Sequence, residues 1–231
     1  MLFRSYVTNN DGSISSNVSV NRSTGFSIVE FNTGGSSSVT VGHGLGATPS
    51  LLITKNRDNT SNWIVWHTSL TAGNYYLLLQ QTDAQQAGVN FYPNSTTFGF
   101  GHSASERWIT YLWTAIPGYS AFGSYTGNGS SDGTFVYTGF RPRYILQKCS
   151  SQASSWIIWD TTRSTYNVLS NADLLTNSSA AEGGGSWGTA IDILSNGFKF
   201  RNADSYAFNA SNQTYIYAAF AEIPFKYARS R

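Results

Sequence analysis

Short apolar runs, separated by turn residues, follow one another along the whole chain. Residues 50–56 and 143–149 are apolar runs with β-branched members, and 62–67 and 155–160 are apolar at nearly every position. Runs of this length are too short for helices, and their β-branched and aromatic residues favour strands. Gly, Asn and Ser between them supply turns. The pattern predicts an all-β protein of antiparallel strands with sandwich-type packing.

The same pattern occurs twice. Three blocks of sequence recur in the same order in the two halves of the chain, and the first pair aligns without a gap. Self-similarity over this length indicates a repeated structural unit. The matching blocks are 47–67 with 140–160, 96–103 with 196–203, and 108–118 with 215–225.

The repeat sets the predicted domain organisation. We predict two tandem antiparallel β-sandwich modules related by the repeat, 26–118 and 119–231, after a short polar N-terminal arm, 1–25. The joint Pro117-Gly118 leaves no room for a flexible linker, so the modules are expected to pack together.

The arm has two interpretations. Apolar residues alternate weakly along it, at Ile14, Val18 and Val20. It is either a disordered terminus or a strand that is added to the sheet edge of a neighbouring molecule. On the second interpretation, deleting 1–25 abolishes assembly and leaves both modules folded.

Composition narrows the function. Charged residues make up 11% of the chain and the formal net charge is +2, so no basic surface for nucleic acid is expected. Aromatic residues at 15% argue against a disordered chain. A single cysteine, Cys149, excludes an internal disulfide or a Cys-rich zinc site. No apolar run is long enough to span a membrane, and the N-terminus carries no secretory signal.

Aromatic residues that occupy matched positions in both copies are predicted to be structural, since both copies need the same core. For the Trp residues, a sugar-stacking surface is the alternative to a core or a seam between the repeats. The predicted repeat core consists of Trp63, Trp66, Trp156, Trp159, Phe98, Phe198, Trp113 and Phe220.

Aromatic residues found in only one copy are better candidates for binding or for an interface. Trp187 lies in a glycine-rich loop that has no counterpart in the first copy. Tyr75, Tyr76 and Tyr166 follow the Trp-containing strands, where a rigid amphipathic ring suits an interface. Local packing remains the alternative for all four residues.

No catalytic or metal site is predicted. His43, His67 and His102 are scattered, and no nucleophile elbow accompanies the His102–Arg107 segment. No pair of carboxylates stands out for glycoside hydrolysis. The segment 128–133 has the oxygen atoms of a calcium loop but too few acids, so a plain turn is expected. No cofactor is expected.

Three segments carry a resemblance to a known family. Residues 42–67, 122–148 and 215–231 resemble an uncharacterised family of marine bacteriophage virion domains, of the tail-fibre or head-decoration type. The resemblance covers about 26–231. It implies a β-sandwich module on the surface of a virus particle, oligomeric and without enzymatic activity. The short segment before residue 26 favours a small decoration or tip protein over a long fibre shaft.

The sequence therefore predicts a non-enzymatic virion structural protein, a tail fibre, fibre tip, head fibre or capsid decoration. Its expected partners are further copies of itself, other virion proteins and a host surface glycan, with a trimer favoured because three-fold fibres match particle symmetry. Nucleic acid and membrane are not expected partners. The alternatives are a carbohydrate- or receptor-binding module and the subunit of an extracellular filament. A depolymerase is disfavoured for want of a carboxylate pair.

Overall fold

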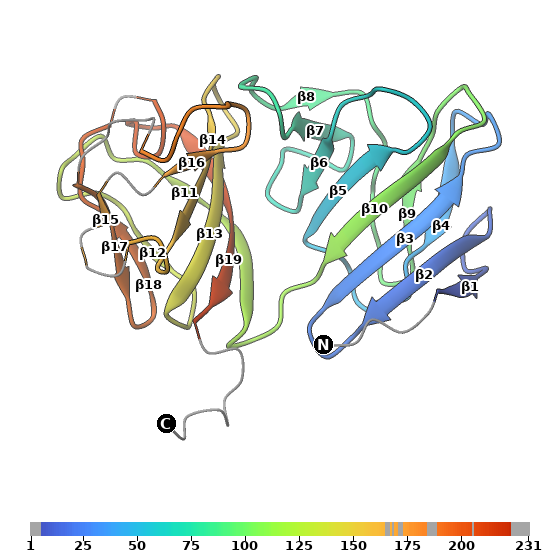
Figure 1. Cartoon of the computed structure of the whole chain (residues 1–231), viewed down its shortest axis with the longest axis horizontal. Coiled ribbons are helices and arrows are strands. Elements are labelled where there is room, and N and C mark those ends of the chain that lie inside the picture. Colours follow the sequence, from blue (N-terminus) through green and yellow to red (C-terminus); the bar gives the residue numbers. More distant parts are fainter. Residues whose placement is uncertain are drawn as a thin grey trace. The chain divides into compact units, whose positions relative to one another are not determined.

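The computed structural model shows an all-β chain (Figure 1). The described residues contain strands, turns and loops and no helix, as the sequence predicted. They are residues 6–222 except 165–166, 168, 171–172, 184–188 and 205.

The chain divides into two compact units. Unit 1 comprises Met1–Leu79 and Gln86–Ile116, and unit 2 comprises Gln80–Gln85 and Pro117–Arg231. The break after Ile116 lies close to the predicted start of the second module at residue 119.

One large antiparallel sheet forms most of unit 1, with the strand order β1-β2-β3-β10-β5-β6-β7-β8. Side chains alternate between its two faces. The inner face carries buried apolar residues such as Val29, Leu52 and Leu112, and the outer-face residues of β3 and β10 are half-buried or exposed. The strands are β1 (Val7–Asn9), β2 (Ser16–Asn21), β3 (Phe26–Asn32), β5 (Leu51–Asn56), β6 (Ile64–His67), β7 (Tyr75–Leu78), β8 (Gln86–Ala87) and β10 (Arg107–Trp113).

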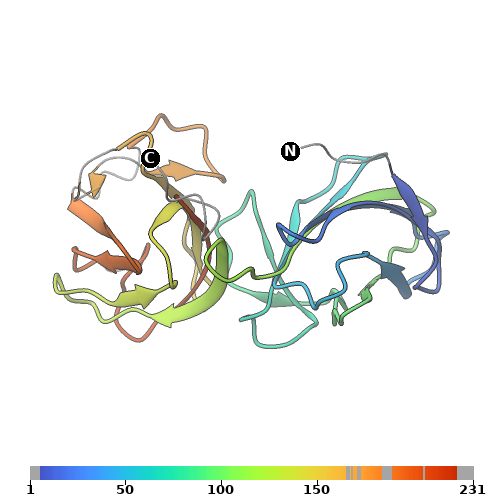
Figure 2. The same ribbon diagram turned by 90° about the horizontal axis from the view of Figure 1, so that it is seen from below.

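A two-stranded sheet of β4 (Val39–Gly42) and β9 (Thr97–Phe100) covers the inner face. Figure 2 shows the large sheet as a curved layer with β4 and β9 on one side of it. Phe98 meets Phe31 edge-on at a centroid distance of 5.8 Å, and Phe100 lies 4.7 Å from Trp108. Edge-to-face and tilted aromatic pairs of this kind join the two layers.

Unit 2 has the same two-layer plan. A sheet with the order β11-β19-β13-β14-β16 faces a sheet with the order β12-β18-β17-β15. Phe198 and Phe200 of the second sheet pack on Tyr125 of the first, at centroid distances of 6.2 and 5.1 Å. The strands are β11 (Ser120–Thr126), β12 (Phe135–Tyr137), β13 (Pro142–Cys149), β14 (Trp156–Asp160), β15 (Leu169–Ser170), β16 (Leu174–Leu175), β17 (Thr189–Leu194), β18 (Gly197–Phe200) and β19 (Thr214–Ala221).

The strand orders of the two units correspond. β3-β10-β5-β6-β7 in unit 1 matches β11-β19-β13-β14-β16 in unit 2, and β4-β9 matches β12-β18. The registers agree as well, because Trp113 pairs with Phe26 as Phe220 pairs with Ser120. This equivalence supports the repeat inferred from the sequence.

The prediction of a separate N-terminal arm is wrong for the described part of 1–25. β2 pairs with β3 along its whole length, and Ser16 and Val18 are buried. A turn closed by the hydrogen bond from Gly25 N to Arg22 O joins the two strands, and Gly25 adopts a φ of 63°. Because of this turn, β2 folds back beside β3, and the alternating residues around Val18 pair with a strand of the same chain.

The segment Gln80–Gln85 belongs to unit 2, although it lies within the first module, 26–118, predicted from the sequence. Thr82 O accepts hydrogen bonds from Ser154 N at 2.8 Å and from the Lys148 ammonium at 3.1 Å. Gln85 N donates to Ser150 O at 2.9 Å. Two of these three bonds join backbone groups, so side-chain periodicity carries no signal for them.

The predicted core residues fall into two groups. Five are buried: Trp66, Phe98, Trp156, Trp159 and Phe198. The other three are not. Trp63 is 36% exposed and precedes β6, while Trp113 and Phe220 are half-buried on the outer faces of β10 and β19.

Strand parity explains the last two cases. Leu112 points into the core of unit 1, so its neighbour Trp113 must point outward, where it lies 4.8 Å from Phe26. Phe220 likewise meets Phe122 and Tyr144 on the outer face, at centroid distances of 5.8 and 6.0 Å.

Candidate functional site

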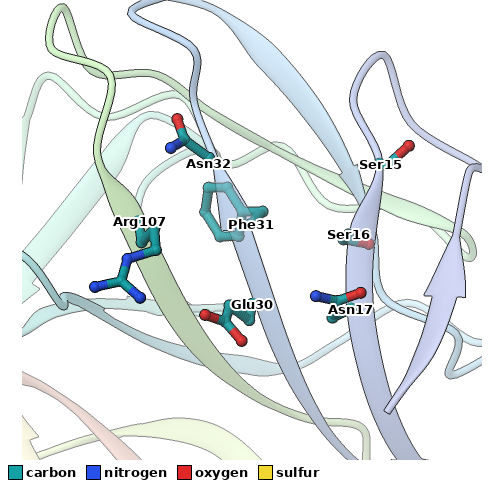
Figure 3. A pocket seen from close by; sticks show the side chains of 7 residues that line it. All are labelled: Ser15, Ser16, Asn17, Glu30, Phe31, Asn32 and Arg107. Atoms are coloured by element: carbon teal, nitrogen blue, oxygen red, sulfur yellow. The ribbon is translucent and has the colours of Figure 1, made fainter.

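A shallow polar pocket lies over β2, β3 and β10 of unit 1 (Figure 3). Its volume is about 270 Å³. It is lined by Ser15, Ser16, Asn17, Glu30, Phe31, Asn32 and Arg107.

Sheet register brings the polar side chains together. Asn17 is the cross-strand partner of Glu30, and Asn32 is the cross-strand partner of Arg107. Glu30 and Asn32 are two positions apart on β3, so both point to the same, outer face. The intervening Phe31 points into the core and is 3% exposed. The pocket is therefore a polar area on the outer face of a sheet whose inner face is apolar.

Two carboxylates at this end of the sheet, those of Glu30 and Asp58, are each paired with an arginine. Glu30 forms an ion pair with Arg57. Asp58 Oδ1 accepts hydrogen bonds from Arg107 Nε at 2.9 Å and Nη2 at 2.6 Å, and Asp58 Oδ2 accepts from Arg107 N at 2.7 Å. These hydrogen bonds lower the pKa of Asp58 and raise that of Arg107. The four charges sum to zero.

The loop after β5 holds these pairs in place. Asn56 Oδ1 accepts hydrogen bonds from the N–H groups of Asp58 and Asn59, at 2.8 and 2.9 Å. The amides of Asn56 and Asn59 both donate to Glu106, each at 2.5 Å. Asx turns and side-chain bonds of this kind fix a loop without regular structure.

Several polar groups of the pocket make no hydrogen bond to the described residues. They are the side-chain amide of Asn17, the Asn32 amide nitrogen, Arg107 Nη1 and the second oxygen of Glu30. Asn32 is nevertheless held in place, because its Oδ1 accepts from Gly34 N at 2.8 Å and from Ser105 Oγ at 3.1 Å. The pocket thus offers oriented donors and acceptors without net charge, which suits a neutral ligand rich in hydroxyl groups.

The structure does not gather the predicted binding residues around this pocket. Tyr75 and Tyr76 are half-buried on β7, which β10, β5 and β6 separate from β3. The Tyr76 hydroxyl donates to Gln86 Oε1 of β8 at 3.2 Å, so it has a local structural role. Trp187 and Tyr166 lie outside the described residues.

Sequence reasoning missed an exposed pair of aromatic residues on one strand of unit 2. Phe135 and Tyr137 on β12 are 43% and 66% exposed, and Val136 between them is buried. The signal was present, because aromatic residues two positions apart lie on one face of a strand. Both residues also have no aromatic counterpart in the first copy.

The histidines and the loop 128–133 take structural roles. His43 and His67 are buried and accept hydrogen bonds from Leu45 N and Ser69 N, at 3.2 and 3.0 Å. In the loop, Asn128 donates to Asp132 O at 2.9 Å, and the Asp132 carboxylate pairs with Lys199. Within the described part of the chain, no group of three or more His, Cys, Asp or Glu side chains is placed to hold a metal ion.

By its fold and its site, the chain is an all-β protein of two-layer units. A polar pocket lies on the outer face of one sheet, and the ion pairs beside it balance in charge. The chain belongs to the family described as a domain of unknown function, DUF7483, whose match covers residues 4–224. No curated protein and no solved structure matches the chain. The described residues form no helix that is long and apolar enough to cross a membrane.

Proposed function

We propose that this chain is a non-enzymatic structural protein of a virus particle surface, which assembles as a homo-oligomer and attaches to a neutral host glycan through the pocket of unit 1. The observation that carries the attachment is the set of donors and acceptors that Asn17, Glu30, Asn32 and Arg107 leave free in the pocket. Other bonds hold the last three of these side chains in place. Vicinal hydroxyl groups of a sugar pair well with amides, guanidinium groups and carboxylates that are already held in place.

The state of the carboxylates favours binding over hydrolysis. A glycosidase needs a carboxylic acid whose pKa is raised, so that it can protonate the leaving group. Asp58 shows the opposite, since its hydrogen bonds with Arg107 lower its pKa. Glu30 forms an ion pair with the Arg57 guanidinium, so its carboxylate already has a cationic partner.

Composition and resemblance support the assembly part of the proposal. A surface rich in Ser, Thr and Asn with 11% charged residues is soluble and can still pack against copies of itself. The virion location and the trimeric state rest on the resemblance to phage structural proteins.

The attachment part is tested on an array of bacterial surface glycans with three purified proteins: wild type, Asn17→Ala/Asn32→Ala and Asn90→Ala. The double variant should lose at least tenfold in affinity for the glycans that the wild type binds. Asn90 is exposed in unit 1 away from the pocket, so its variant should bind normally. Equal binding by all three proteins contradicts a role for the pocket.

The assembly part is tested by light scattering across a concentration series. A mass of three chains, independent of concentration, is the expected result. A strict monomer at all concentrations contradicts the homo-oligomer.

A further inference from the structure

Phe135 and Tyr137 form an exposed aromatic surface on β12 of unit 2. They are neighbours on the outer face of the four-stranded sheet, about 6.6 Å apart along the strand. Their cross-strand partners on β18 are Lys199 and Gly197. Because Gly197 has no side chain, Tyr137 has no bulky cross-strand neighbour on β18.

Gly197 also supports the Phe135 ring. A Cβ atom on Gly197 would lie 3.1 Å from Phe135 Cε2 and 2.1 Å from Val136 O. One edge of the Phe135 ring therefore lies close to the Gly197 backbone, while the residue remains 43% exposed. We call Phe135, Tyr137 and Gly197 the aromatic platform.

Polar groups border the platform on the same sheet face. Lys199 forms an ion pair with Asp132 at 2.7 Å, and Arg201 pairs with Asp192 at 2.5 Å. Asp192 is the cross-strand partner of Lys199, so Phe135, Lys199 and Asp192 lie in one row across three strands. The Tyr137 hydroxyl makes no hydrogen bond to the described residues.

The platform exists in only one of the two equivalent units. Val136 pairs with Phe198 as Val41 pairs with Phe98. The positions equivalent to Phe135 and Tyr137 are therefore Thr40 and Gly42. The shared fold does not require aromatic residues here, since unit 1 forms the same strand pair without them.

We propose that the aromatic platform is a second glycan contact, which stacks on the apolar face of a β-linked pyranose. The hydroxyl groups at the edge of the sugar ring would meet Lys199 and Asp132. This inference rests on the attachment part of the proposed function and adds to it the ligand class and a site on unit 2. Stacking of sugar C–H groups on an aromatic face needs a flat, open ring with polar groups beside it, and the platform supplies both.

The size of the platform favours a sugar over a second copy of the chain. A stable protein interface buries about 800 Å² on each partner. Two half-exposed aromatic rings supply well below half of that, at about 150–250 Å² for a fully buried ring. Asp132, in the ion pair beside Phe135, has a side chain that is 81% exposed and whose charge would be costly to bury.

The test measures binding of cellohexaose and of a β-1,4-linked galactose hexamer by calorimetry and by saturation-transfer NMR. Tyr137→Ala and Phe135→Ala should each weaken binding at least tenfold, and Tyr137→Trp should retain it. Tyr206→Ala is the matched control, because Tyr206 is 47% exposed elsewhere in unit 2. Both platform residues are exposed, so the melting temperature should not change.

Three outcomes overturn the inference: no binding of either hexamer by the wild type, equal binding by all variants, or a fall in oligomeric mass in Phe135→Ala/Tyr137→Ala. The last outcome would make the platform an interface between copies. The pocket is tested separately by Asn17→Ala/Asn32→Ala. If the platform variants bind array glycans normally while the pocket variant does not, the platform inference fails and the proposed function stands.

Discussion

At the scale of single residues, Lys148 shows that equivalent strand positions of the two units differ in burial. Lys148 on β13 and Lys55 on β5 occupy matched positions, and each ammonium donates to the carbonyl of the next residue, Cys149 O at 2.7 Å and Asn56 O at 3.1 Å. Lys55 is half-buried, whereas Lys148 is completely buried and also donates to Thr82 O. The buried lysine therefore joins Gln80–Gln85 to the sheet of unit 2.

Because Lys148 is buried, we expect the free energy of unfolding to depend on pH in the alkaline range. Desolvation lowers the pKa of its ammonium from 10.5 to about 8. Between these values the unfolded chain binds more protons than the folded chain, so stability should rise with pH in this window. Relative to Lys148→Met, the wild type should gain about 2 kcal/mol between pH 7 and pH 10, at about 1.4 kcal/mol per pKa unit. Urea unfolding across this range measures the difference, and parallel curves for the two proteins would refute the expectation.

Tyr125 gives a second residue-scale prediction. Its hydroxyl is buried in unit 2, 3.0 Å from Gln147 Oε1 and 2.8 Å from Phe208 O. Tyr125→Phe leaves these acceptors without their donor, which should lower the free energy of unfolding by about 1–3 kcal/mol. Tyr137→Phe removes an exposed hydroxyl of the same kind and should change stability little. Chemical denaturation of both variants checks the pair, and similar values for the two would contradict the argument.

At the scale of elements, β2 covers one edge of β3 by pairing with it. β3 in unit 1 has β2 on one side and β10 on the other, whereas the equivalent strand β11 has only β19 as its strand neighbour among the described residues. Unpaired strand edges invite association with other chains. Residues 16–21 thus complete the sheet of unit 1 itself, so deleting them should damage unit 1 rather than assembly alone.

Two valines test the role of this hairpin. Val18 on β2 is 4% exposed and Val7 on β1 is 66% exposed. Val18→Ala should cost about 1.5 kcal/mol, at about 0.8 kcal/mol for each buried carbon removed. Val7→Ala should be nearly neutral. Thermal and urea unfolding measure both, and a neutral Val18→Ala would mean that β2 adds little to unit 1.

At the scale of the whole molecule, the path of the chain links the two units. The chain leaves unit 1 at Leu79, supplies Gln80–Gln85 to unit 2 and returns at Gln86. The two units are equivalent in strand order but are not independent segments of sequence. Unfolding of unit 2 must release a segment that unit 1 holds at both ends.

This path predicts that a fragment of residues 117–231 is less stable than unit 2 in the intact chain. The fragment lacks the backbone of Thr82 and Gln85, so Lys148 Nζ, Ser154 N and Ser150 O lose partners. The loss should be about 2–4 kcal/mol, because a buried ammonium is left without one of its acceptors. Hydrogen exchange of the backbone amides in the β13–β14 pairing, whose partners are present in both proteins, measures it. Thr82→Ala in the full chain keeps the carbonyl and should be neutral, and equal protection in fragment and full chain would refute the prediction.

The sequence by itself determined the fold class and the periodic core. Short β-branched runs identify strands locally, and matched aromatic residues such as Phe98 and Phe198 mark the positions that face the second sheet in each unit. It also contained, unrecognised, the alternation of Phe135 and Tyr137 around Val136. These features are readable because they depend on side-chain type and on spacing along one strand.

Only the tertiary structure decided the rest. The pocket arises where Asn17, Glu30 and Arg107, far apart in sequence, become neighbours through strand pairing. Which face Trp113 takes depended on register, since a shift of one residue would reverse it. The entry of Gln80–Gln85 into unit 2 rests on backbone hydrogen bonds that any sequence can make and on the ammonium of Lys148, which is distant in sequence. Long-range pairing is set by the free energy of the whole fold, and single-sequence periodicity does not report it.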